Sequence, residues 1–325
     1  MADLKKEMKQ FHEIIALSSG KKGALRKSRN AIRERIRKYF QDTLKVSVPK
    51  FQGQGSYSMH TMINPLDGEF DIDDGVYLQH LDASDMSEWP TPPTAHQWLL
   101  KATNDHTNEK SIDKQTCVRV RFGGKYHVDL PTYGSLSGVY LLANKGPKGW
   151  HASDPKAITD WFLKQEGDQL RRVVRYLKAW ADFQSGRIGK LPSGLILTVL
   201  ATHHIQADDR DDVSLSRTVT AISNNVNPFF IVFNPVDGSE ELTSRLSEEQ
   251  KLRFQDAIRK FADDASNAID SDDLEKASKL WRKQFGDRFP LITSDERNES
   301  RKREDAARIA GFYAAKNPTK PWGWD

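Results

Sequence analysis

The sequence is poor in cysteine and in long apolar runs. Its 325 residues include a single cysteine, Cys117, which excludes an intramolecular disulfide and a cysteine-rich zinc module and is typical of a reducing compartment. The longest apolar run, LILTVLAT near residue 195, is too short to cross a bilayer, and the N-terminus MADLKKEMKQ lacks the apolar core of a signal peptide. We therefore expect a cytoplasmic protein with no membrane partner.

The sequence also has no strong excess of charge of one sign. It contains 49 Lys and Arg against 45 Asp and Glu, a net charge of +4, so composition alone does not require a nucleic-acid partner. The cations are unevenly spread, because residues 21–38 (KKGALRKSRNAIRERIRK) contain one acid, Glu34. This segment is either a solvated helix face, which is the simpler interpretation, or a wall of an anion-binding cleft.

Apolar spacing predicts a mixed α/β region followed by a mostly helical one. Residues 1–45 are expected to be helical, with a narrow apolar stripe under the basic surface at Leu25, Ile32, Ile36 and Phe40. Alternating apolar residues then predict strands in EFDIDDGVYL and CVRVRFGGKYHVDL. Gly123 and Gly124 separate the two halves of the second stretch and predict a hairpin there.

The chain is long enough for two packed lobes. From about residue 160 onward the apolar period becomes helical, with one buried stripe expected at Leu170, Val173, Val174, Leu177 and Ala181. We therefore predict an α+β fold of three parts. Residues 1–160 form a mixed lobe, residues 161–293 form a helical lobe, and residues 294–325 form a charged connector and a tail rich in aromatic residues and proline.

Acids are crowded in one of the predicted strands. Asp71 and Asp73 are separated by one apolar residue, so they share a face of the strand. Two unit charges about 4 Å apart repel by roughly 4 kcal/mol at an effective dielectric of about 20, so a cation is expected between them. Asp129, in KYHVDLPTY, is the candidate third carboxylate. Oxygen ligands without Cys or His favour Mg²⁺ or Mn²⁺.

A turn of small residues precedes these acids. In the stretch GQGS, backbone N–H groups around Gly55 could approach an anion closely, and Ser56 could begin a helix and place its hydroxyl on the same phosphate. Three acids on adjacent strands can hold two divalent ions, one activating a hydroxyl and one bridging nucleotide phosphates. The turn and the acids together predict nucleotidyl transfer.

Other interpretations of the acids fit less well. An EF-hand loop counted from Asp71 would need an oxygen ligand at Gly75, glycine at Val76 and glutamate at Asp82, so that pattern fails. Two carboxylates one residue apart on a strand are poorly placed to flank a sugar ring from opposite sides. A solvated strand end with no bound ion is the remaining structural alternative.

The sequence resembles the polymerase-β-like nucleotidyltransferases and, within them, the bacterial CD-NTases. These are relatives of animal cyclic GMP-AMP synthase that make cyclic oligonucleotide signals in CBASS anti-phage defence. The resemblance runs from about residue 10 to residue 290. It rests on the stretches QGSYSMHTMINPLDGEFDIDDGVYL, HVDLPTY, RRVVRYLKAW, LPSG, NPFFIVFNPVDG and WRKQFGDRFP. It implies a bilobal nucleotidyltransferase core, a mixed sheet with helices, and a C-terminal helical lobe that closes the nucleotide cleft.

The resemblance also implies roles for individual residues. Asp71, Asp73 and Asp129 become a metal triad that holds two Mg²⁺ or Mn²⁺ ions. The implied nucleotide-binding residues are Gln54, Gly55, Ser56, Lys178 and Ser193. We add Tyr133 as a candidate for stacking on a base. The predicted N-cap position of Ser193 after Pro192 supports its role near an anion.

The implied reaction joins nucleoside triphosphates, ATP and GTP in the favoured case, and closes a cyclic dinucleotide with release of pyrophosphate. DIDDGVYL is closer to the cyclic GMP-AMP branch, but spacing does not distinguish a dinucleotide from a trinucleotide product. The sequence departs from the animal relative because it has no Cys/His cluster for a zinc insertion that grasps DNA. A nucleic-acid activator is therefore not expected.

Two other functions stay open at this point. A related transferase could modify RNA 3′ ends or a protein target, which the basic segment 21–38 favours. A catalytically decayed interaction protein is also possible in principle, although the intact triad argues against it. We further expect the tail, FYAAKNPTKPWGWD at residues 312–325, to dock on this chain or on an accessory protein.

Overall fold

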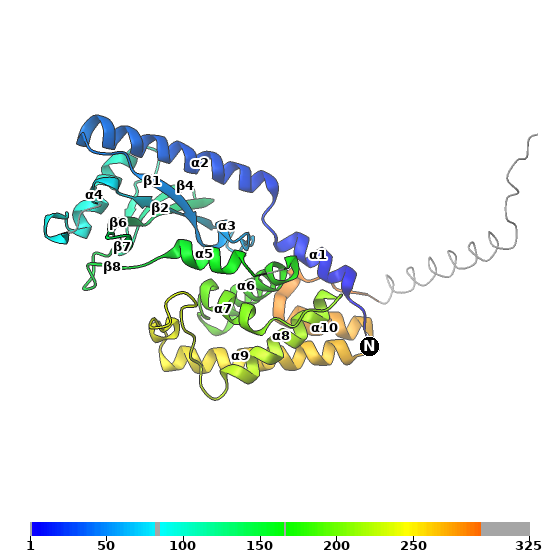
Figure 1. Ribbon diagram of the computed structural model, residues 1–325. Helices are drawn as coiled ribbons and strands as arrows, with labels where there is room; N and C mark the ends of the chain where they lie inside the picture. The colour runs from blue at the N-terminus through cyan, green and yellow to red at the C-terminus, as the bar shows by residue number, and fades with distance from the viewer. Residues whose placement is uncertain (1, 82–84, 166, 294–325) are drawn as a thin grey trace, which may run out of the picture.

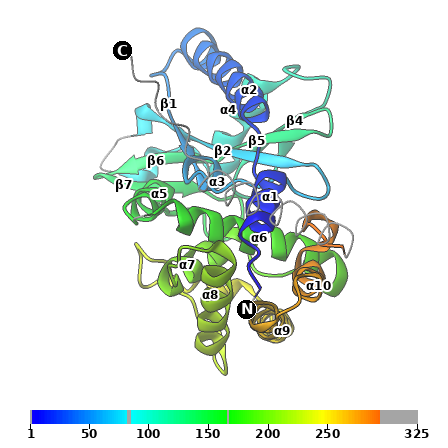
Figure 2. The ribbon, with the colours of Figure 1, turned by 90° about the vertical axis from the view of Figure 1, so that its right-hand side faces the viewer.

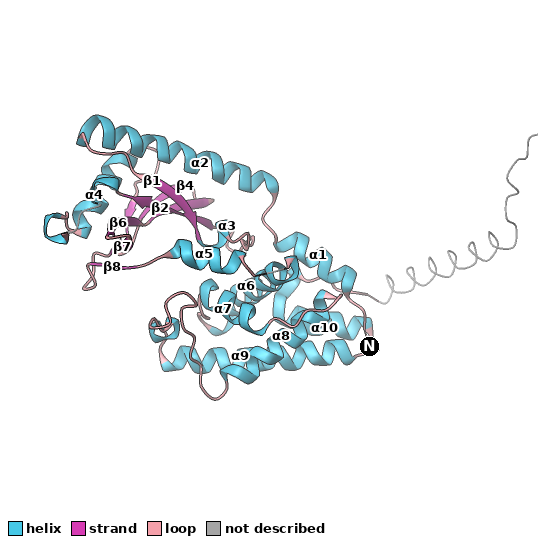
Figure 3. Ribbon diagram, viewed as in Figure 1, coloured by secondary structure: helices cyan, strands magenta, loops and turns pink. Residues whose placement is uncertain are grey.

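The computed structural model describes residues 2–81, 85–165 and 167–293 and has two lobes (Figure 1). One lobe, here called the sheet lobe, contains a mixed sheet with helices packed against it. The other, the helical lobe, is built from helices (Figure 3). The α+β prediction is thus confirmed. The tail and the connector at residues 294–325 lie outside the described residues.

Eight strands form the sheet. The strand order is β3-β4-β5-β2-β6-β7-β8. Strand β1 lies outside this order and pairs with β2. β2 runs parallel to β5 and β6 and antiparallel to β1. The strands are β1 Lys50–Gln54, β2 Phe70–Tyr77, β3 Ile112–Asp113, β4 Val118–Phe122, β5 Tyr126–Leu130, β6 Thr132–Leu136, β7 Val139–Ala143 and β8 Trp150–Ala152.

The predicted hairpin is confirmed between β4 and β5. Phe122 pairs with Tyr126, and the turn between them places Gly123 and Gly124 at φ +59° and +66°. This left-handed backbone conformation is available to glycine without a Cβ clash. Cys117, just before β4, is buried.

Helix α2 (Ser19–Lys38) lies across the sheet face that points away from Asp71 and Asp73. The predicted stripe is confirmed, because Leu25, Ile32 and Ile36 are fully buried. Ile32 and Ile36 share a core with Val76 and Val128. Further helical segments of the sheet lobe are α3 Gly55–Ser58, α4 Pro92–Thr103, the π-helical η1 Tyr39–Leu44 and the short η2 Gln79–Leu81 and η3 Met86–Glu88.

The helical lobe surrounds a large apolar core. Trp180 on α6 and Trp281 on α10 are fully buried in it, and Phe261 on α9 stacks on Trp180 with ring centroids 5.2 Å apart. Its helices are α6 Asp168–Ile188, α7 Gly194–His204, α8 Asp211–Val226, α9 Glu248–Asp270 and α10 Leu274–Phe285, with η4 Leu242–Arg245 and η5 Gly286–Arg288. Within the described part of the chain, no helix combines the length and apolarity that a bilayer-spanning helix requires.

The predicted boundary between the lobes needs two corrections. Helix α5 (Pro155–Leu163) spans residues 160 and 161, so the division does not fall between them. Helix α1 (Lys5–Ile15) belongs with the helical lobe, where it lies against α6 and α8 (Figures 1 and 2). The physical reason is its apolar face, because Phe11 packs on Phe285 with ring centroids 4.4 Å apart.

Candidate active site

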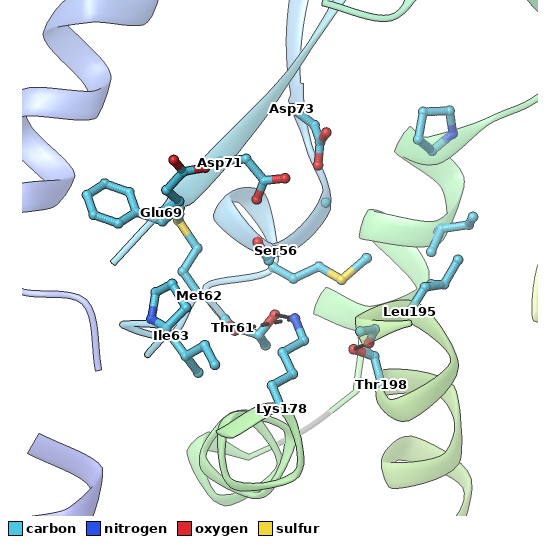
Figure 4. A pocket seen from close by; sticks show the side chains of 17 residues that line it. Ser56, Thr61, Met62, Ile63, Glu69, Asp71, Asp73, Lys178, Leu195 and Thr198 are labelled. Atoms are coloured by element: carbon cyan, nitrogen blue, oxygen red, sulfur yellow. Dashed lines mark hydrogen bonds between the residues drawn. The ribbon is translucent and has the colours of Figure 1, made fainter. Parts of the chain in front are cut away.

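A cavity of about 440 Å³ opens between the two lobes. The sheet lobe contributes Ser56, Asp71 and Asp73 to its lining, and the helical lobe contributes Lys178 and Thr198 (Figure 4). Acids on one side therefore face a cation on the other. Met59, Met62, Ile63, Ile158 and Leu195 add apolar lining.

Strand register brings the three predicted acids to one face of the sheet. Asp73 on β2 pairs directly with Asp129 on β5, and Asp71 pairs with His127. Asp71, His127 and Asp129 each offer a ligand atom, and these atoms lie within 4.8 Å of one another. Nε2 of His127 lies 3.6 Å from Oδ2 of Asp71. The structure thus adds a histidine that the sequence interpretation left out of the acid cluster.

Asp73 lies among like charges in a partly buried position. Burial, together with the charges of Asp71 and Asp129, raises the pKa of Asp73 to about 7. The interaction with His127 lowers the pKa of Asp71 instead. A partly buried carboxylate whose pKa is raised by neighbouring acids is a site at which a bound cation would be strongly favoured.

The predicted phosphate turn begins helix α3 and touches Asp73. Gly55 has φ +59°, and a Cβ added there would lie 2.5 Å from Oδ2 of Asp73. Two features therefore require glycine at position 55, namely the positive φ of the backbone and the close approach of the Asp73 carboxylate. Ser56 follows inside α3 and lines the same cavity as Asp71 and Asp73.

Gln54 and Tyr133 require a correction. Tyr133 is 2% exposed and stacks on Tyr77 with ring centroids 4.8 Å apart, so its ring is not available to a base. Its hydroxyl donates to Oε1 of Gln54 at 3.2 Å, and Nε2 of Gln54 donates to the Tyr77 hydroxyl at 3.1 Å. Both side chains therefore support the phosphate turn from behind and do not line the cavity.

Lys178 reaches the cavity from helix α6. Its Nζ donates to Oγ1 of Thr61 at 3.0 Å and to the Thr61 carbonyl at 3.3 Å. Burial lowers the pKa of Lys178 to about 8. Gly194 makes room for this side chain, because a Cβ there would come within 3.0 Å of Cε of Lys178.

Ser193 has the predicted capping position. It is the N-cap of α7, and its hydroxyl accepts from the Ile196 amide at 3.5 Å. The next two residues, Gly194 and Leu195, line the cavity, so the N-terminus of α7 points toward it. Free amides at a helix N-terminus favour anions.

Asp129 has a protein cation as its partner. Nε and Nη2 of Arg119 donate to its two carboxylate oxygens at 2.6 and 2.7 Å. Lys114 is farther away, with Nζ 3.9 Å from Oδ2. The hydrogen bonds to Asp129 raise the pKa of Arg119.

The central arginines of the basic helix α2 make contacts within the protein, whereas Lys22, Arg26, Lys27 and Lys38 are exposed. Arg33 makes a bidentate pair with Asp74, which is fully buried and points away from Asp71 and Asp73. Arg35 donates to the carbonyls of Ala102 and Asn104 at the end of α4. The interpretation of this helix as a cleft wall is thus wrong for its central arginines, because they serve packing behind the sheet.

The donor set fits a hard divalent cation. Carboxylate oxygens from β2 and β5 converge, and Asp73 keeps a raised pKa despite the nearby Lys178 and Arg119. Such oxygen-rich sites suit Mg²⁺ or Mn²⁺, and an imidazole ligand such as that of His127 is compatible with Mn²⁺.

Known proteins share both lobes of this chain. Residues 49–133 match the family described as cyclic GMP-AMP synthase DncV-like, nucleotidyltransferase domain, and residues 167–297 match the cyclic GMP-AMP synthase C-terminal domain. A protein of Escherichia albertii named cyclic GMP-AMP synthase is 30% identical over 302 residues. That match covers 88% of this chain and 64% of the relative, so the chain spans less than two thirds of that protein's length.

Solved structures show the same fold. The crystal structure of Vibrio cholerae DncV cyclic AMP-GMP synthase superposes with a TM-score of 0.74 at 20% identity, covering 90% of this chain and 100% of that chain. A structure of the Vibrio protein with the linear intermediate 5′ pppA(3′,5′)pG gives a TM-score of 0.71 at 22% identity, covering 86% and 96%. Because the two matched domains together cover more than half of the chain, it belongs to the family of cyclic GMP-AMP synthase DncV-like nucleotidyltransferases.

Proposed function

We propose that this protein is a metal-dependent nucleotidyltransferase that makes a cyclic dinucleotide from nucleoside triphosphates and releases pyrophosphate. The observation that supports this most directly is the placement of Asp71 and Asp73 opposite Lys178 in one cavity, with Asp129 paired to Asp73 on the next strand. Acids that attract cations and a lysine that attracts phosphates suit a nucleotide bound with its metal ions.

Each residue has a defined part in this proposal. Asp71, Asp73 and Asp129 hold the cation, which when bound neutralises phosphate charge and makes an attacking hydroxyl more acidic. Ser56 and the N-terminus of α3 hold a phosphate on the sheet side. Lys178 holds phosphates from the helical side, and the N-terminus of α7 at Ser193 faces the same group. The phosphoryl group is thereby fixed for in-line attack.

The proposal of cyclisation and of particular bases is supported by the similar proteins and not by the geometry of the cavity. The Escherichia albertii relative is named a cyclic GMP-AMP synthase, and a structure of the Vibrio cholerae protein contains a linear pppA(3′,5′)pG intermediate. We propose that the present chain likewise uses ATP and GTP in two successive transfers. We also propose that its product acts as a second messenger in bacterial anti-phage signalling.

The direct test is product analysis. The purified full chain is incubated with ATP, GTP, CTP and UTP and with Mg²⁺ or Mn²⁺, the mixture is treated with phosphatase, and the survivors are separated and weighed by mass spectrometry. A phosphatase-resistant species with the mass of cyclic GMP-AMP is expected. Asp73→Asn keeps the side-chain shape but removes a ligand charge, and we expect it to lower product formation at least about a hundredfold.

Other results would redirect the proposal. A resistant product of three nucleotides would keep the enzyme class and change the product. Equal synthesis by the wild type and by folded Asp73→Asn would contradict the role of the acids. Labelled nucleotide transferred to RNA or to a protein, with no cyclic product, would replace cyclisation by modification of a macromolecule.

A further inference from the structure

The pair formed by Arg119 and Asp129 bears directly on how the acids accept a metal ion. Arg119 lies on β4 directly opposite Asp129 on β5, and its guanidinium donates to both carboxylate oxygens at 2.6 and 2.7 Å. The two side chains are 20% and 10% exposed, so the pair is mostly shielded from water. Such bidentate pairs are stronger than single hydrogen bonds between neutral groups.

The same carboxylate is needed by the metal site. An oxygen of Asp129 lies within 4.8 Å of ligand atoms of Asp71 and His127. A divalent ion placed among these atoms would lie close to the Arg119 guanidinium, and two cations at such separation repel one another. The guanidinium and the metal ion therefore compete for one group.

We propose that Arg119 is a positioning residue that acts as an internal counter-ion for Asp129 in the metal-free protein and must release this carboxylate when a divalent cation binds. This inference rests on the proposed metal site. Without a metal ion, Arg119 offsets the repulsion among Asp71, Asp73 and Asp129. With a metal ion, loss of the Arg119 hydrogen bonds lowers the net affinity, so Arg119 sets the cation concentration at which the site fills.

The test measures binding of Mn²⁺ alone by calorimetry, with the purified full chain and no nucleotide. Arg119→Gln removes the competing donors, and we expect the Mn²⁺ concentration for half-saturation to fall about three- to tenfold. The variant should also be less heat-stable than the wild type without metal and gain more stability when Mn²⁺ is added.

Two control variants separate competition from general electrostatics. Lys114→Gln also removes a positive charge near Asp129, but its Nζ is 3.9 Å from Oδ2 and makes no hydrogen bond there. Arg121 lies two residues farther along β4, opposite His127, and Arg121→Gln breaks its ion pair with Glu109 at 3.0 Å without touching Asp129. We expect a smaller gain in Mn²⁺ affinity for Lys114→Gln than for Arg119→Gln, and none for Arg121→Gln.

Each result decides the inference. The inference is overturned if the wild type and Arg119→Gln reach half-saturation at the same Mn²⁺ concentration. It is also overturned if Arg119→Gln and Lys114→Gln gain the same Mn²⁺ affinity. The proposed function stands in both cases. Absence of Mn²⁺ binding by every folded form, also with ATP present, would reject the metal site and the proposed function together. If Arg119→Gln does not fold, Arg119→Lys keeps the charge but loses the bidentate contact, and it must still bind Mn²⁺ more tightly than the wild type.

Discussion

Two side chains of the cavity, Asp73 and Lys178, change charge at opposite limits of a narrow pH range. In the metal-free protein the pKa of Asp73 is raised to about 7 and that of Lys178 is lowered to about 8. Below pH 7 Asp73 gains a proton and loses its attraction for a cation. Above pH 8 Lys178 loses its proton and its attraction for phosphate. Binding of a metal–nucleotide complex is therefore expected to be strongest between these values.

This pH optimum can be measured with Mn²⁺ and a nonhydrolysable ATP analogue from pH 6 to pH 9. Lys178→Arg keeps its charge above pH 8, so its alkaline loss of affinity should move to higher pH while the acidic loss stays in place. An affinity that is constant over the whole range would contradict the assignment of these two groups to the nucleotide site.

Gly55 is the residue at which the smallest substitution should have a large effect. In Gly55→Ala the new methyl group would meet Oδ2 of Asp73 at 2.5 Å, and the backbone would have to keep φ +59°. We expect unfolding free energy to fall by about 1 kcal/mol, and synthesis to fall at least about tenfold because Asp73 is displaced.

A matched glycine provides the control for this substitution. Gly23 lies inside α2, and a Cβ added there would meet no atom within 4 Å. Gly23→Ala should raise the unfolding free energy by roughly 0.5 to 1 kcal/mol and leave synthesis unchanged. Chemical denaturation and product assays on both variants test the pair. Wild-type activity in Gly55→Ala would show that Asp73 can move without cost.

The sequence identified the acids of the cavity but not all of their neighbours. Alternation along one strand is enough to place Asp71 and Asp73 on one face. The same rule applied to β5 would have placed His127 beside Asp129. A two-residue turn at Gly123 and Gly124 would have paired Asp129 with Val118, whereas the turn in the structure includes Lys125 and pairs Asp129 with Arg119. Thr61 gave no such signal, because its contact with Lys178 joins two lobes across 117 positions of sequence.

Among the secondary-structure elements, helix α2 adds a buried ion pair to its apolar contacts with the sheet. Arg33 is 17% exposed and Asp74 is fully buried. Arg33→Met keeps most of the side-chain volume but leaves Asp74 buried without its cation. We expect unfolding free energy to fall by about 3 kcal/mol.

Arg37 on the same helix is the comparison, because it pairs with the exposed Glu34. Arg37→Met should cost less than about 1 kcal/mol. Urea denaturation of both variants gives the difference. If the two variants are equally stable, the Asp74 pair does not anchor the helix, and solvent must reach the carboxylate.

The position and the buried face of a helix were easier to predict from the sequence than the surface against which the helix packs. The stripe at Leu25, Ile32 and Ile36 identified α2 and its buried face, since apolar spacing is a local property. The partner of α1 was not predictable in this way. The apolar face of α1 does not identify the core against which it packs. That core contains Phe285 and Phe289, which follow α1 by more than 250 positions in the sequence.

At the scale of the whole molecule, helix α1 packs against residues that lie near the other end of the described chain. Phe11 is fully buried and contacts Phe285 and Phe289 with ring centroids 4.4 and 5.5 Å away. Phe11→Ala should lower unfolding free energy by about 3 to 5 kcal/mol, through lost burial and the cavity that remains.

Ile14 on the same helix is 42% exposed, so Ile14→Ala is a matched control that should cost less than about 1 kcal/mol. Thermal denaturation and urea titration of the two variants test the contrast. A cost for Phe11→Ala no larger than that for Ile14→Ala would mean that α1 is not an integral part of the helical lobe.

The position of α1 also has a consequence for synthesis on the ribosome. Phe285 and Phe289, two of the aromatic partners of Phe11, are among the last described residues to be translated, long after α1. Until residues near 289 have left the exit tunnel, the native surface around Phe11 is incomplete, because Tyr176 of α6 is the only one of its described aromatic partners available to its ring before then. The sheet lobe, which is complete by about residue 152, can form while the nascent chain grows. The helical lobe closes only after translation has passed its last helices.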